Sequence, residues 1–206
     1  MFITTIHHGR PTLFHIRLEA FSDGVIAVII TIMVLELKVP RQNGFAGLRA
    51  IVPTLAIYLI SFSLTAIYWI NHHHLVRRID QADERVLYAN LSFLFCLSLL
   101  PFFTSYVLEK ENDAFSIALY AASMVITGFG FLLLRLAIDR RLRISGALRQ
   151  VDTSAQRKHL LSLVLYGIAI PLAYYRPWLA MADIALVTIV WIIPTAGTKP
   201  CDEETR

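Results

Sequence analysis

Long stretches without a charged side chain organise this sequence. Four of them contain no Asp, Glu, Lys or Arg, namely residues 50–76, 86–108, 114–134 and 159–175. A fifth stretch, 177–198, contains only Asp183. A helix that crosses a bilayer needs about 20 predominantly apolar residues, with a lower limit of about 17. Residues 17–39 add a further hydrophobic segment, with charges near both of its ends.

The pattern predicts an all-α membrane protein whose residues 1–206 form a single transmembrane domain. We expect six spans, at about 17–39, 48–76, 86–108, 114–136, 159–175 and 178–195. Composition agrees, because 56% of the residues are hydrophobic and only 17% are charged, whereas soluble domains carry about 25% charged residues. The first span is not expected to be a signal peptide, since it lacks a small-residue cleavage site.

The connections between the spans are short, apart from a basic segment at 137–158 that Ser145-Gly146 is expected to break. They leave no room for a soluble catalytic domain, and neither zinc-protease nor serine-hydrolase nor phosphate-loop motifs occur. The sequence therefore does not indicate an enzyme, and no cofactor is expected. The basic segment lacks interleaved aromatic residues, so nucleic acid is not an expected partner. Membrane lipid is an expected partner.

The basic residues predict the orientation of the chain. An even number of spans places both termini on one side, and that side would carry 14 of the 19 Lys and Arg residues. The positive-inside rule then predicts cytoplasmic termini in the cell membrane.

The first span differs from the others because Asp23 and Glu36 are separated by only 12 uncharged residues. That is about 18 Å of helix, well short of a hydrocarbon core of about 30 Å. On a helix, Gly24, Thr31, Ile32 and Leu35 lie within about 60° of Val28, whereas Asp23 lies about 140° away. This apolar stripe fits either a buried packing face or, around a symmetry axis, a hydrophobic constriction.

Three motifs in order along residues 10–110 resemble one family. Arg17-Leu18-Glu19-Ala20-Phe21-Ser22-Asp23 matches the R-x-x-x-F-S-D signature of the transmembrane protein 175 family of potassium channels. The segment from Ser61 to His74, with Trp69 and His73 four residues apart, resembles the second helix of that family. Leu99-Leu100-Pro101-Phe102-Phe103-Thr104 resembles its third helix.

The resemblance implies a potassium-selective cation channel, assembled as a homotetramer whose first helices line a central pore. It assigns the pore constriction to Val28, with Ile32 and Leu35 in the same stripe, and a selectivity layer to Thr31. The signature residues Arg17, Phe21, Ser22 and Asp23 would join Trp69 and His73 in a network that holds the pore helix. Since the chain contains no T-V-G-Y-G segment, the carbonyl filter of ordinary potassium channels is absent.

The residues alone suggest two alternatives, of which the transporter remains open. A secondary transporter of a cation or small solute would place ionisable residues at the midplane, and Asp183 is the candidate. His72-His73-His74 suggests a metal site, but consecutive histidines point about 100° apart on a helix and cannot share one tetrahedral ion. No bound metal is therefore predicted, and potassium is expected only as the permeant ion.

Overall fold

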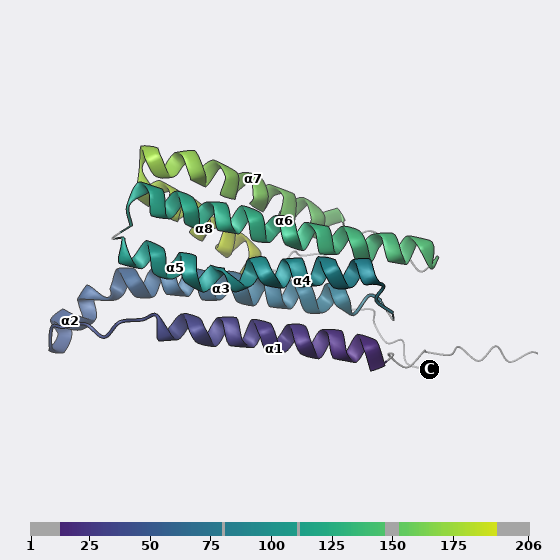
Figure 1. The fold of residues 1–206 in the computed structure, drawn as a ribbon. Coiled ribbons are helices and arrows are strands. Elements are labelled where there is room, and N and C mark those ends of the chain that lie inside the picture. Colours follow the sequence, from purple (N-terminus) through teal and green to yellow (C-terminus); the bar gives the residue numbers. More distant parts are fainter. Residues whose placement is uncertain (1–12, 80, 111, 147–152, 193–206) are drawn as a thin grey trace, which may run out of the picture.

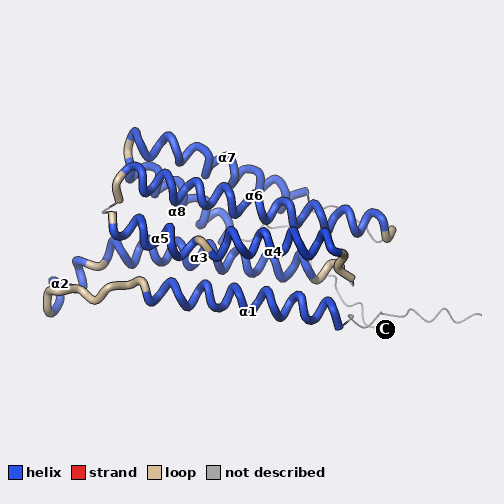
Figure 2. Tube along the Cα trace, in the orientation of Figure 1, coloured by secondary structure: helices blue, strands red, loops and turns tan. Residues whose placement is uncertain are grey.

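The computed structural model describes residues 13–192 except 80, 111 and 147–152. The described residues contain eight helices and no strand (Figure 2). The helices are α1 (Leu13–Leu35), α2 (Gly44–Ala50), α3 (Val52–Val76), α4 (Glu84–Ser98), α5 (Leu100–Glu109), α6 (Ala114–Ile144), α7 (Thr153–Tyr175) and α8 (Pro177–Ile192).

The long helices lie side by side in one elongated bundle (Figure 1). α1 lies at one edge and packs against α3, α4 and α5. α6 packs against α4, α5, α7 and α8, and α7 lies at the edge opposite α1. The first helix is therefore attached to the bundle by one side.

Aromatic rings fill the centre of the bundle. Phe93 on α4 is completely buried, and its ring lies 5.6 Å from that of Tyr68, 5.3 Å from that of Phe131 and 5.7 Å from the stacked imidazole of His72. Gly130 on α6 allows this close packing, because a Cβ there would lie 3.3 Å from Phe93 Cα. α3, α4 and α6 are thus held together around one ring.

Two of the expected spans are interrupted by short breaks. The second divides into α2 and α3 at Ile51, and the third divides into α4 and α5 at Leu99. Proline lies in the first turn of α3 and of α5, as Pro53 and Pro101, where its missing N–H costs no intrahelical hydrogen bond. Pro171 lies within α7.

The basic segment at 137–158 is helical on both sides of the expected break. α6 continues to Ile144, and α7 begins at Thr153. The apolar stretch ends where charged residues begin, but the helix does not end there. It continues because Arg and Leu are both good helix formers. α6 ends at Ser145, and Gly146 follows it with φ of 69°, a conformation that favours glycine. The break expected at Ser145-Gly146 is confirmed.

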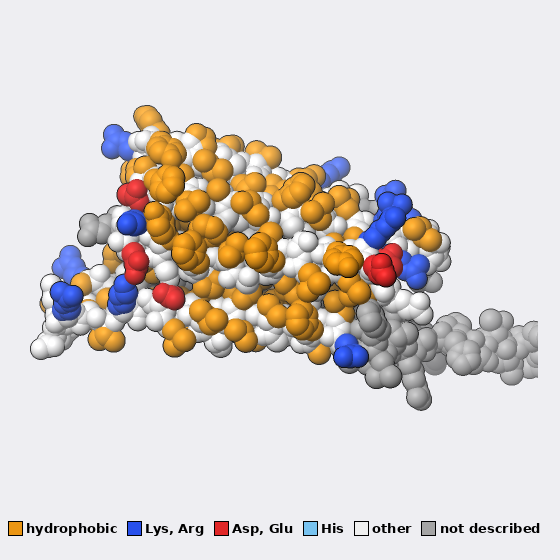
Figure 3. All heavy atoms as spheres, in the orientation of Figure 1, with side chains coloured by type: hydrophobic (Ala, Val, Ile, Leu, Met, Phe, Trp, Pro, Cys, Tyr) orange, Lys and Arg blue, Asp and Glu red, His pale blue; other side chains and the backbone are white. Residues whose placement is uncertain are grey.

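The helices have the length and composition of a multi-pass membrane protein. Five of them are long and apolar enough to cross a bilayer when α4 and α5 are taken as one span, and α8 is a shorter apolar helix. Figure 3 shows hydrophobic side chains over the middle of one face, with Lys, Arg, Asp and Glu gathered towards the two ends. This distribution matches a bilayer core between two aqueous surfaces.

Candidate functional site

The two faces of α1 have different surroundings. One face packs into the bundle through residues spaced three or four apart, namely Leu18, Ser22, Ile26, Ile29 and Met33. The other face is exposed and carries the predicted stripe. Val28 is 54% exposed, Ile32 42% and Leu35 79%, and Thr31 and Gly24 are also exposed. The stripe is therefore not a packing face within one chain.

Thr31 is the polar member of this stripe. Its hydroxyl donates a hydrogen bond to the carbonyl oxygen of Val28 at 2.9 Å. Because the proton points back along the helix, the lone pairs of Thr31 Oγ1 are directed away from the backbone. An exposed oxygen of this kind is an acceptor or a cation ligand rather than a donor.

An apolar groove of about 940 Å³ runs along α1, between this helix and the α4–α5 pair. Gly24, Val28 and Ile32 line one wall, and Pro101 and Phe102 line the other. A Cβ added at Gly24 would meet open space, so the glycine is not required by packing within the chain. A small residue on an exposed apolar face instead suits close approach by another helix.

Acidic residues lie at one end of the groove, where Glu36 and Glu109 contribute to its lining. Lys38 Nζ donates a hydrogen bond to Glu109 Oε1 at 2.7 Å, which ties the segment after α1 to the end of α5. This hydrogen bond and the carboxylate charge raise the pKa of Lys38 above its usual value. The groove therefore ends in fixed charges, as expected where a helix leaves the hydrocarbon core.

A buried hydrogen-bonded chain links α1 to α4 and α3. Asn90 Nδ2 donates to Ser22 Oγ at 2.9 Å, and Asn90 Oδ1 lies 2.7 Å from His72 Nε2. All three side chains are completely buried. Ser22 was predicted from the signature, whereas Asn90 and His72 were not; the available signal was an amide within a charge-free span.

A second set of contacts joins α1 to α3 closer to the surface. The Trp69 indole donates to Asp23 Oδ1 at 2.9 Å, and His73 Nδ1 lies 2.9 Å from Glu19 Oε1. The structure thus brings Asp23, Trp69 and His73 together, with Glu19 as a member that the signature did not single out. Arg17 and Phe21 are exposed and lie on the outer surface of α1.

Comparison with known proteins gives consistent similarities. Residues 17–101 match the family described as "Endosomal/lysosomal potassium channel TMEM175". A potassium channel of Chryseobacterium sp. (strain P1-3) is 37% identical over 178 residues, which cover 86% of this chain and 92% of that protein. The human endosomal/lysosomal proton channel TMEM175 is 24% identical over 161 residues, which cover 75% of this chain and 32% of that protein.

A solved structure is also similar to the bundle. The crystal structure of a lysosomal potassium-selective channel TMEM175 homolog from Chamaesiphon minutus superimposes with a TM-score of 0.73 at 25% sequence identity. The alignment covers 86% of this chain and 96% of that one. The similarity therefore extends beyond the signature segment to most of the helical bundle.

Proposed function

Since the chain belongs to the TMEM175 family, we propose that it is a potassium channel in which four copies surround a pore lined by α1. The family and its relatives are channels rather than enzymes. We further propose that the channel lies in the cell membrane with both termini cytoplasmic, on the basis of the Lys and Arg count.

The observation that carries the proposal is the exposure of Val28, Thr31 and Leu35 on a helix whose other face is packed. A single α1 cannot enclose a pore, so several copies must meet around a rotational axis. The small residues Ala20, Gly24 and Ala27 are exposed as well, and they would allow the helices to approach closely. A purely lipid-facing surface has no need of such small residues.

In this arrangement, Val28, Ile32 and Leu35 form apolar layers along the pore. Narrow hydrophobic layers gate conduction by excluding water, and an ion that has lost its water faces a large barrier. Val28 is the proposed constriction, as the resemblance to the family implies, and Thr31 and Leu35 follow it on the same stripe towards the Glu36 end. The Thr31 hydroxyls lie one turn from this layer and offer oxygen lone pairs to a partly dehydrated cation.

Replacing Thr31 by Ala is expected to lower the potassium-to-sodium permeability ratio about fivefold, which corresponds to four hydroxyls that together favour potassium over sodium by about 1 kcal/mol. Thr31→Ser keeps the hydroxyl and is the matched control, expected to stay near the starting ratio. Reversal potentials under bi-ionic conditions give both ratios. An unchanged ratio in Thr31→Ala would remove Thr31 from the selectivity layer.

Reconstitution tests the function as a whole. The purified full chain in planar bilayers is expected to show discrete single-channel steps carried by potassium. In detergent solution, the purified particle is expected to have the mass of four chains. A secondary transporter would instead give slow, saturable flux without steps. Proton permeability is measured in the same bilayers with a pH gradient, since a relative is named a proton channel. Protein-free bilayers are the control, and potassium flux without steps would overturn the proposal.

A further inference from the structure

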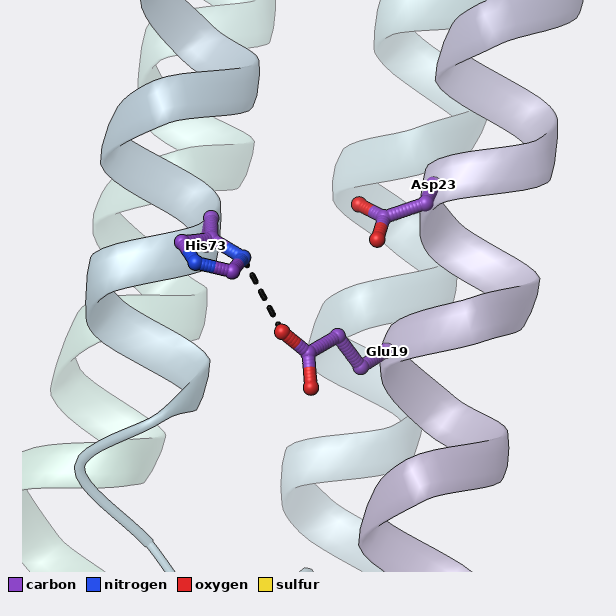
Figure 4. A group of neighbouring side chains, drawn as sticks. All are labelled: Glu19, Asp23 and His73. Atoms are coloured by element: carbon purple, nitrogen blue, oxygen red, sulfur yellow. Dashed lines mark ion pairs between the residues drawn. The ribbon is translucent and has the colours of Figure 1, made fainter.

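Three potential metal ligands from two helices meet beside the inner face of α1. Glu19 and Asp23 lie one turn apart on α1, and His73 lies opposite them on α3. One ligand atom from each residue can be chosen so that all three lie within 4.8 Å of one another. Figure 4 shows the two carboxylates directed towards the gap between the helices and the imidazole across it.

His73 and Glu19 form a close contact between the two helices. His73 Nδ1 lies 2.9 Å from Glu19 Oε1, at the distance of an ion pair. Nδ1 also has almost no surface accessible to solvent. A nitrogen and a carboxylate oxygen that face each other in this way are arranged like two ligands of one cation.

The surroundings of Asp23 support the same arrangement. Trp69 donates its indole N–H to Oδ1, which orients the carboxylate and leaves Oδ2 for a further interaction. A hydrogen bond of this kind, from outside the ligand set, is typical of metal sites. A divalent cation would also neutralise two carboxylates that stand at like-charged i, i+4 positions, a pairing that otherwise destabilises a helix.

We propose that Glu19, Asp23 and His73 bind one first-row transition-metal dication of the Zn²⁺ type. One imidazole and two carboxylates suit zinc and its neighbours better than a hard cation such as Ca²⁺ or a soft one such as Cu⁺. Bonds of about 2.1 Å in tetrahedral geometry need ligand atoms roughly 3.4 Å apart. The His73–Glu19 pair, now 2.9 Å apart, would open slightly, and ligand atoms up to 4.8 Å apart would close in by about 1 Å. The fourth position is then open to water.

A metal ion at this position would act on how α1 is held, which is separate from the conduction of potassium. An ion bridging Glu19 and Asp23 to His73 fixes the start of α1 against α3. Since α1 carries the proposed pore stripe on its other face, the bound metal restrains the helix that conducts. The metal site itself depends only on contacts within one chain, and it stands whether or not the pore proposal holds.

Arg77 competes with the metal. Arg77 caps the C-terminal end of α3, and its Nη1 lies 3.4 Å from His73 Nε2. When a metal occupies Nδ1, Nε2 carries the imidazole proton, so the guanidinium must turn aside. Arg77 is exposed and has room to move. Arg77→Gln removes the competing positive charge and is expected to tighten metal binding about tenfold, since a lost repulsion of about 1.4 kcal/mol is a factor of 10.

The test is a titration of the purified full chain with Zn²⁺ by calorimetry, and with Co²⁺ by visible absorption. We expect saturable binding of one ion per chain, weakened about 100-fold by His73→Gln and about tenfold by Trp69→Phe. His74→Gln is the matched control, because His74 is the exposed neighbour on the same helix and should leave the affinity unchanged. Thermal melting without metal verifies that each variant is folded.

Tighter binding in Arg77→Gln cannot result from misfolding and would support the site directly. The absence of saturable binding, or an equal loss in His73→Gln and His74→Gln, would overturn the proposal and leave a simple ion pair. Zn²⁺ added to reconstituted protein is then expected to reduce potassium current in the original chain but not in His73→Gln. Metal binding without any potassium current would contradict the proposed function and leave the metal site intact.

Discussion

Replacing Val28 by Asn is expected to raise the potassium current at least about tenfold, which corresponds to a barrier lowered by ~1.4 kcal/mol. Val28 is 54% exposed on the stripe that we propose faces the pore. Four amides in that layer would hydrogen bond to water and keep the constriction wet, so that an ion crosses with part of its hydration shell. Single-channel conductance and open probability in planar bilayers measure the effect.

Two further variants separate polarity from size at this position. Val28→Thr has nearly the volume of the original side chain and adds only a hydroxyl, so we expect the current to rise in the same direction as with Asn. Val28→Leu stays apolar and is larger, so we expect the current to fall. A rise in Val28→Leu, or no change in either polar variant, would show that Val28 does not form the constriction.

Truncating Phe93 to Ala is expected to cost about 3–5 kcal/mol in the free energy of unfolding, the usual range for a buried phenylalanine. The Phe93 ring lies at the junction of α3, α4 and α6, in contact with Tyr68, Phe131 and the His72 imidazole. Its removal leaves a cavity next to the Ser22–Asn90–His72 chain that holds α1. Denaturation in mixed detergent micelles, followed by tryptophan fluorescence, measures the loss.

Phe95→Ala provides the matched control two residues further along α4. Phe95 is 65% exposed, so its truncation removes surface hydrophobic area but opens no cavity. We expect a change within about 0.5 kcal/mol, as for most surface positions. Equal losses in Phe93→Ala and Phe95→Ala would contradict a core organised around Phe93.

The two faces of α1 separate support from proposed conduction. The inner face contacts the bundle through Ser22, Asp23 and Glu19, which reach α4 and α3. The outer face carries Val28 and Thr31, which are exposed and are not part of the packed core of the chain. Substitutions on the outer face are therefore expected to alter current with little effect on stability, whereas those on the inner face alter both.

The sequence by itself determined which segments are apolar helices, because water and hydrocarbon impose the same requirement on every candidate span. It also predicted that Val28, Thr31, Ile32 and Leu35 share one face, since this follows from 3.6 residues per turn within a single helix. The structure adds that this face is exposed. Periodicity left that choice open, because a packing face and an unpartnered face have the same spacing.

The resemblance grouped Asp23 with Trp69 and His73, but only the tertiary structure decided which side chains pair across helices. The partner of Asp23 is Trp69, the partner of Ser22 is Asn90, and Glu19 approaches His73. These contacts depend on how far each helix is rotated and shifted against its neighbour, and no local pattern encodes that. The same limit applies to the histidine triplet, whose own spacing gives no metal site, although one member, His73, faces two carboxylates once α1 packs against α3.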